Sequence, residues 1–156
     1  MEAGSLTVML VEDEPGFRSL VTAVLDEGPF RVQAADLDDW CEDAKNACPD
    51  VLLLDLALQG GQSAVEQIPR IVAACPATMV AALTGSPAED LEPSVLRAGA
   101  FVFYEKETVG QLPDFIVEDL ALFHRAQKGE EVVAPSAVTR RRSSTPASSR
   151  SERADD

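Results

Sequence analysis

The chain has 156 residues, which suffices for one domain with a substantial apolar core but not for two full domains. Its formal net charge is −14, and residues 1–126 hold 22 Asp and Glu against 7 Lys and Arg. Such an acidic surface repels nucleic acid phosphates, so direct binding of DNA or RNA is not expected. No segment reaches the roughly 18 apolar residues of a membrane span and the N-terminus has no signal-peptide pattern, so we expect a cytoplasmic protein without a membrane partner.

The first half of the chain alternates apolar runs with amphipathic segments. Residues 6–11 form an apolar run typical of a strand, and Pro15 is well placed to open the helix that follows. A short strand over 30–34 and an amphipathic helix over 38–47 come next. The run 50–55 has four consecutive large aliphatic residues between two aspartates, which predicts a central strand buried on both faces.

The second half repeats this alternation. Its patterns predict a helix over 65–75, a strand over 78–83, a helix over 86–98, a strand over 101–104 and a final helix capped by Thr108-x-x-Gln111. The chain thus reads as five strands that alternate with five helices. That alternation predicts a doubly wound parallel sheet with right-handed crossovers.

Polar side chains follow four of these strands where each strand ends. They are Glu12, Asp13, Asp55, Thr84 and Lys106. Because the carboxyl ends of parallel strands share one edge of a sheet, where ligands bind in such folds, these side chains are expected on one rim. Three carboxylates in one place repel one another unless a cation lies among them, and hard oxygen ligands favour magnesium. Each residue also has a simpler interpretation: Asp55 could cap a turn, and Thr84 before Gly85 is common in turns. Glu12 and Asp13 could be solvated charges at a strand end, and Lys106 could be a surface lysine.

Two further features concern the tail and the cysteines. Apolar periodicity ends near Ala126, so we expect a domain over 1–126 and a disordered Arg- and Ser-rich tail over 127–156. The three cysteines are odd in number and contain no Cys-x-x-Cys pair. Buried reduced thiols are therefore expected rather than a disulfide or a metal site.

Over roughly residues 5–126 this order of residue types resembles the receiver domain of two-component response regulators. The resemblance rests on the acidic pair after the first strand, the aspartate, threonine and lysine after the third, fourth and fifth strands, and Gly99-Ala100 before the fifth. It implies a flavodoxin-like (βα)5 fold with strand order 2-1-3-4-5. The chain departs from the family at Glu107, where a proline is usual, and in the loop after Asp55.

The resemblance also implies a magnesium site. Its ligands would be the side chains of Glu12, Asp13 and Asp55 and the main-chain carbonyl of Ala57. All four are hard oxygen donors, as Mg²⁺ prefers.

By the same resemblance, Asp55 accepts a phosphoryl group. Thr84 and Lys106 contact that group, and Phe103 is the aromatic residue that enters the space left when the Thr84 hydroxyl moves. Since Phe103 has no hydroxyl, such a switch would act through packing alone.

The implied partners are a sensor histidine kinase and a downstream protein effector. Contact is expected through the face built by the fourth helix, fifth strand and fifth helix, which could also form a homodimer. Residues 129–141 resemble the linker before a helix-turn-helix domain, so the chain reads as a receiver without its DNA-binding domain. Two alternatives stay open: an interaction module that works without phosphorylation, and a haloacid-dehalogenase-like phosphatase, which Ala57 disfavours because that family has an aspartate there.

Overall fold

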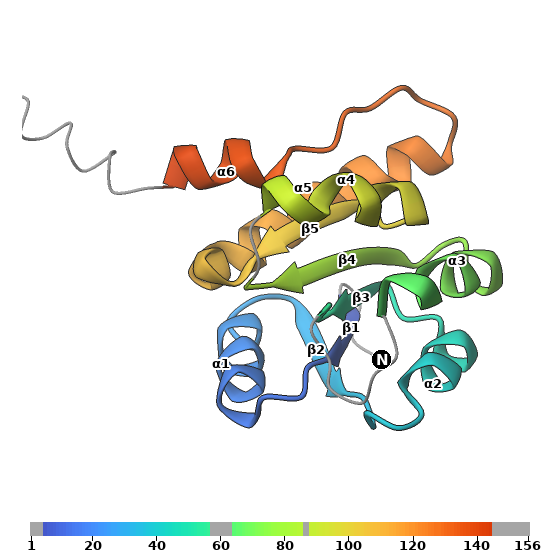
Figure 1. Cartoon of the computed structure of the whole chain (residues 1–156), viewed down its shortest axis with the longest axis vertical. Helices are drawn as coiled ribbons and strands as arrows, with labels where there is room; N and C mark the ends of the chain where they lie inside the picture. The colour runs from blue at the N-terminus through green and yellow to red at the C-terminus, as the bar shows by residue number, and fades with distance from the viewer. Residues whose placement is uncertain (1–4, 57–63, 86–87, 145–156) are drawn as a thin grey trace, which may run out of the picture.

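The structure, a computed structural model, describes residues 5–56, 64–85 and 88–144 (Figure 1). Its strands are β1 (Leu6–Val11), β2 (Phe30–Ala34), β3 (Val51–Leu54), β4 (Met79–Thr84) and β5 (Val102–Glu105). Its helices are α1 (Pro15–Leu25), α2 (Trp40–Ala47), α3 (Ala64–Ala74), α4 (Ala88–Ala98), α5 (Leu112–Gln127), α6 (Ala137–Ser144) and the 3₁₀ helix η1 (Lys106–Gln111).

The five strands form one parallel sheet in the order β2-β1-β3-β4-β5. This confirms the predicted flavodoxin-like fold class and strand order. β3 lies at the centre, paired with β1 on one side and β4 on the other. Its side chains alternate between the two faces: Val51 and Leu53 pack with one core cluster, Leu52 and Leu54 with the other. A strand covered on both faces needs the continuous aliphatic run seen in the sequence.

Helices cover both faces of the sheet (Figure 1). The cluster on one face takes Val21 from α1 and Ile116 from α5, and the cluster on the other takes Ala44 from α2, Ile68 from α3 and Val95 from α4. This two-layer cover fixes the strands so that their carboxyl ends meet at one rim.

The expected capping box before the last helix is replaced by a 3₁₀ turn. The Thr108 hydroxyl donates to the carbonyl of Glu105 at 2.8 Å, and α5 begins only at Leu112. A threonine hydroxyl bonds a carbonyl three residues back as readily as it caps a helix, so the pattern in the sequence placed the start of α5 too early.

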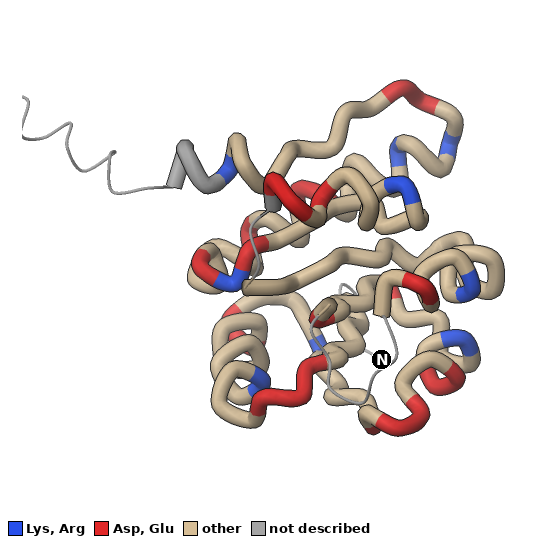
Figure 2. Tube along the Cα trace, viewed as in Figure 1, with Lys and Arg blue, Asp and Glu red and all other residues tan. Residues whose placement is uncertain are grey.

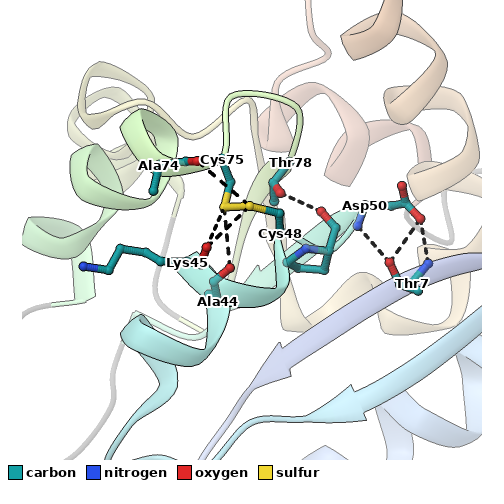
Figure 3. Close-up of a disulfide and its surroundings, with 9 residues drawn as sticks. Thr7, Ala44, Lys45, Cys48, Asp50, Ala74, Cys75 and Thr78 are labelled. Carbon is teal, nitrogen blue, oxygen red and sulfur yellow. Dashed lines mark hydrogen bonds between the residues drawn. A yellow bond between two sulfur atoms is a disulfide. The ribbon is translucent and has the colours of Figure 1, made fainter.

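The prediction of reduced cysteines is wrong for two of the three. Cys48 and Cys75 form a disulfide with a Cα–Cα distance of 5.4 Å, whereas Cys41 is free (Figure 3). Cys48 ends α2 just before β3, and Cys75 follows α3 just before β4. Because β3 and β4 are parallel neighbours, the segments that enter them lie side by side, which a reading of Cys spacing in the sequence does not reveal.

Hydrogen bonds fasten the same amino-terminal edge of the sheet (Figure 3). The Asp50 carboxylate accepts from the amide and hydroxyl of Thr7 at 2.9 and 3.1 Å, which joins β3 to β1. The Thr78 hydroxyl donates to the carbonyl of Pro49 at 2.6 Å, which joins β4 to β3. These contacts set the register of the three central strands at the edge opposite the rim.

The C-terminal segment differs from the disordered tail expected over 127–156. α5 extends through Gln127, and residues 137–144 form α6, which packs beside α4 and β5 (Figure 1). Ala137 and Arg140 are buried, so the expectation is wrong for this helix. Residues 145–156 lie outside the described residues, and the domain boundary near Ala126 stays a prediction.

We expect Cys48→Ser with Cys75→Ser to lower the free energy of unfolding by about 3 kcal/mol, because the disulfide closes a loop between residues 27 apart in sequence. Urea unfolding without reductant measures this change. Cys41→Ser, which removes the free thiol, is the matched control and should change the free energy much less. If the double variant is as stable as the native chain under oxidising conditions, the two sulfurs are not bonded.

A second prediction concerns Glu92 on α4, whose carboxylate accepts from the amide of Ala137 at 3.0 Å. Burial, and then the nearby carboxylates of Glu105 and Glu89, raise the pKa of Glu92 above 4.5 despite that hydrogen bond. The folded state therefore binds this proton more tightly than the unfolded state, and stability falls as pH rises above 4.5 toward the raised value. Glu92→Gln removes this loss, so the stability of Glu92→Gln relative to the native chain should increase over that pH range in urea unfolding. A difference that is constant with pH would contradict the raised pKa.

Candidate functional site

Three carboxylates converge at the carboxyl ends of β1 and β3. Glu12 and Asp13 follow β1, Asp55 follows β3, and one oxygen from each lies within 4.8 Å of the others. The amide of Asp55 donates to the carbonyl of Val11 at 2.9 Å, so the strand pairing itself brings the two strand ends together. Glu12 and Asp55 are only 1% and 3% exposed, and Asp13 is half-buried. The predicted convergence of these carboxylates is confirmed.

Lys106 brings a positive charge to the cluster from the end of β5. Its Nζ lies 2.9 Å from Oε1 of Glu12 and 3.7 Å from Oδ2 of Asp55. The ammonium also stands 4.5 Å from the ring centroid of Phe17, a cation–π contact that restricts where the side chain can point. The predicted Lys106 is thus brought together with Glu12 and Asp55.

Burial raises the pKa of Glu12, and the neighbouring Asp55 carboxylate raises it further. The ion pair with Lys106 and the amide of Glu14 act in the opposite direction without cancelling the effect of burial. The raised pKa therefore reflects mainly the loss of water around a buried carboxylate, and the repulsion from Asp55 is a smaller contribution. Three carboxylates face one ammonium.

The loop after β1 is held by its own side chains. Oε2 of Glu12 accepts from the amide of Glu14 at 3.1 Å, and Nη1 of Arg18 donates to the carbonyl of Glu12 at 3.0 Å. The Glu14 carboxylate caps α1 by accepting from the amides of Gly16 and Phe17. The sequence analysis assigned neither Phe17 nor Arg18 a role at this site. Their position on the first turn after the acidic pair is the signal that could have found them.

The remaining candidates lie near the rim or inside the core. Thr84 is the last residue of β4, is fully buried and pairs in register with Glu105. Phe103 is also fully buried, opposite Ala82, in the core cluster on the α2, α3 and α4 face. The predicted metal ligand Ala57 lies outside the described residues.

The donor set fits a hard divalent cation. Carboxylate oxygens are the ligands that Mg²⁺ uses, and neither histidine nor thiol occurs in this cluster, as zinc would favour. Glu12 and Asp55 are buried and Asp13 is half-buried, so a cation bound here would relieve the repulsion among the three carboxylates.

Among the described residues, no helix is long and apolar enough to cross a membrane.

The fold and this cluster define a class: a doubly wound α/β domain with an acidic site and a lysine on its carboxyl-end rim. The family model for the response regulator receiver domain matches residues 8–121. The chain therefore belongs to the receiver-domain family of two-component response regulators.

One curated protein matches most of this chain. The chain is 29% identical over 136 residues to a protein of Bacillus subtilis (strain 168) described as an uncharacterized transcriptional regulatory protein, YxjL. The match covers 85% of this chain but only 59% of that relative, so the chain spans about three fifths of the length of the protein it matches.

Solved structures support the fold. A LuxR-family response regulator from Aurantimonas sp. SI85-9A1 matches with a TM-score of 0.68 and 22% identity over 86% of this chain and 93% of that one. The receiver domain of the putative regulator NarL from Mycobacterium tuberculosis matches with a TM-score of 0.66 and 21% identity over 75% and 97%. The receiver domain of a putative Luxo repressor from Vibrio parahaemolyticus gives 0.69 and 22% over 82% and 99%.

We expect Asp13→Asn to weaken Mg²⁺ binding by roughly tenfold, equivalent to about 1.4 kcal/mol, because it removes one of three clustered charges. Isothermal titration of Mg²⁺ measures the affinity. The control is Asp26→Asn at the other end of α1, which is exposed and should leave the affinity unchanged. Equal affinities of Asp13→Asn and the native chain would remove Asp13 from the ligand set.

Proposed function

We propose that this chain accepts a phosphoryl group on Asp55 from the phosphohistidine of a sensor histidine kinase, with Mg²⁺ held by Glu12, Asp13 and Asp55. The observation that carries the proposal is the position of Asp55. Its carboxylate ends the central strand, lies among two other carboxylates and is 3.7 Å from the ammonium of Lys106.

In the transfer step an oxygen of the Asp55 carboxylate forms a bond to phosphorus. The bond from phosphorus to the histidine nitrogen breaks, and the imidazole leaves with the electron pair. When bound, Mg²⁺ supplies positive charge that offsets the charge on the transferring oxygens. No other substrate is turned over, and hydrolysis of the acyl phosphate returns Asp55.

The residues around Asp55 have distinct roles in this proposal. Lys106 already bridges Glu12 and Asp55, so its ammonium can draw toward the added phosphoryl oxygens without a large movement. Thr84, buried at the end of β4, supplies a hydroxyl that can donate to one of those oxygens. Phe103 responds to that movement only through packing, because its ring lies fully buried in the core and has no hydroxyl.

The signal would leave through contacts with a downstream protein effector in the cytoplasm. The face of α4, β5 and α5 is the proposed surface for that partner and for any homodimer. The segment that joins β1 to α1 is acidic (Figure 2), and Asp55 adds another carboxylate beside it, which disfavours direct contact with nucleic acid.

We expect incubation with acetyl phosphate and Mg²⁺ to add one labile phosphate per chain, read by intact mass. Asp55→Asn should abolish the gain, since the amide cannot act as the nucleophile. Asp90→Asn on the exposed surface of α4 is the matched control and should be labelled like the native chain. No mass gain in a folded native chain would favour a module that acts without phosphorylation, and labelling that persists in Asp55→Asn would place the acceptor elsewhere.

A further inference from the structure

α6 lies along β5 and beside α4, on the face proposed for output (Figure 1). β5 is the last strand in the order of the described sheet, so its outer side has no neighbouring strand. Arg140 from α6 reaches α5, so this short helix connects both helices that flank the strand. The chain itself therefore occupies part of that face.

Arg140 anchors α6 in a pocket built by β5 and α5. Its Nη1 and Nη2 donate to the two carboxylate oxygens of Asp119 at 2.6 and 2.8 Å. The hydroxyl of Tyr104 donates to Oδ2 of the same carboxylate at 2.8 Å. The guanidinium carbon stands 4.1 Å from the ring centroid of Phe115. Asp119 is fully buried and Arg140 is 9% exposed.

The chemistry of this pocket is specific for a guanidinium. A paired fork of donors matches both oxygens of Asp119 while the flat cation covers the ring of Phe115, which a lysine ammonium cannot do. Burial, and then the charge of Asp119, raise the pKa of Tyr104, so its hydroxyl stays a neutral donor. Without a guanidinium, the fully buried carboxylate of Asp119 would lose its paired cation, which is costly.

The rest of α6 is held lightly. Besides Arg140, Ala137 is buried and Val138 is partly buried against the same core cluster, and the amide of Ala137 donates to Glu92 of α4. Residues 130–136, which lead into α6, have no regular secondary structure, and Val133 among them is 88% exposed. Apart from the Arg140 pair, few contacts oppose release of α6, so α6 can leave the face without unfolding α5 once another guanidinium takes the place of Arg140.

We propose that Tyr104, Phe115 and Asp119 form an arginine-binding pocket on the output face, and that its partner is a protein that presents an arginine from a helix. Arg140 of the chain's own α6 fills this pocket and competes with the partner. Such a partner is complementary to the pocket, because a buried carboxylate beside an aromatic face selects a guanidinium. Binding of arginine in this pocket does not require phosphoryl transfer to Asp55.

The test uses the full chain and a labelled peptide of residues 134–144, which presents the same arginine in trans. Fluorescence anisotropy should show that Arg140→Ala binds this peptide at least about tenfold more tightly than the native chain, whose pocket is filled. The same peptide with alanine at position 140 should not bind. Adding Asp119→Asn to the Arg140→Ala chain should abolish binding of the native peptide.

Arg125→Ala is the matched control chain. It removes one arginine from an exposed pair with Glu130, away from the pocket, and should bind the peptide no better than the native chain. The proposal is overturned if Arg140→Ala binds no peptide, binds it whatever residue stands at position 140, or forms dimers that the peptide does not dissociate.

Hydrogen exchange of Arg140→Lys tests the same anchor in a second variant and shows whether the core of that variant is folded. Arg140→Lys keeps the positive charge but loses the paired fork, so amides of residues 137–144 should exchange at least about tenfold faster than in the native chain. Amides of β3 should not change, because the core is untouched. Unchanged protection of α6 in Arg140→Lys would show that Arg140 is not its anchor and would also overturn the proposal.

Discussion

The crowding of negative charge at the carboxyl ends of β1 and β3 is the constraint on which the site depends. The parallel pairing of these strands places Glu12 and Asp55 together whether or not their charges favour it. Lys106 pairs with Glu12, but burial and, to a smaller extent, the neighbouring Asp55 carboxylate still raise the pKa of Glu12. The apolar core that holds the strands in register supplies the energy that keeps like charges close, and the resulting site favours any cation that enters.

β5 connects this site with the C-terminal helix. Lys106 follows the strand at the acidic rim, whereas Tyr104, two residues earlier, donates to the carboxylate that binds Arg140. Phe103, on the opposite face of the sheet from Tyr104, belongs to the same core cluster as Ala137 of α6. Residues at and beside the end of this one strand therefore lie near both the acidic rim and the two buried residues of α6.

How much the sequence could predict depends on how locally each feature is encoded. β1 runs over Leu6–Val11 as predicted, and the strand 50–55 was found within one residue at each end, since a strand buried on both faces must be an aliphatic run. The convergence of Asp13 and Asp55 was predictable for the same reason, because parallel strands end at one rim. The roles of Thr84 and Phe103 came from family resemblance, and their burial is compatible with those roles without testing them.

Features that depend on residues distant in sequence coming together in the fold could not be predicted from the sequence. Cys48 and Cys75 are 27 residues apart in the sequence. They come together only because the segments that precede β3 and β4 lie side by side in the fold. Arg140 is one of three consecutive arginines in a polar segment, with nothing local to mark it as buried. The position of Asp119, the residue that pairs with Arg140, was a signal that the sequence did contain. Asp119 falls on the apolar stripe of α5 beside Ile116 and Leu120, and a carboxylate at such a position requires a buried partner.

Among the described residues, the Lys106–Asp55 and Arg140–Asp119 ion pairs differ in geometry and exposure. The side chain of Lys106 is 23% exposed and its ammonium lies 3.7 Å from Asp55, so it can turn toward a phosphoryl oxygen added at this site. Arg140 instead meets Asp119 through two short hydrogen bonds in a pocket that excludes water. A pair of this kind opens readily only to a group that repeats its chemistry, because a buried carboxylate left alone is strongly destabilising. The acidic rim is thus arranged to exchange its partners, whereas the face beside β5 is arranged to admit one kind of partner.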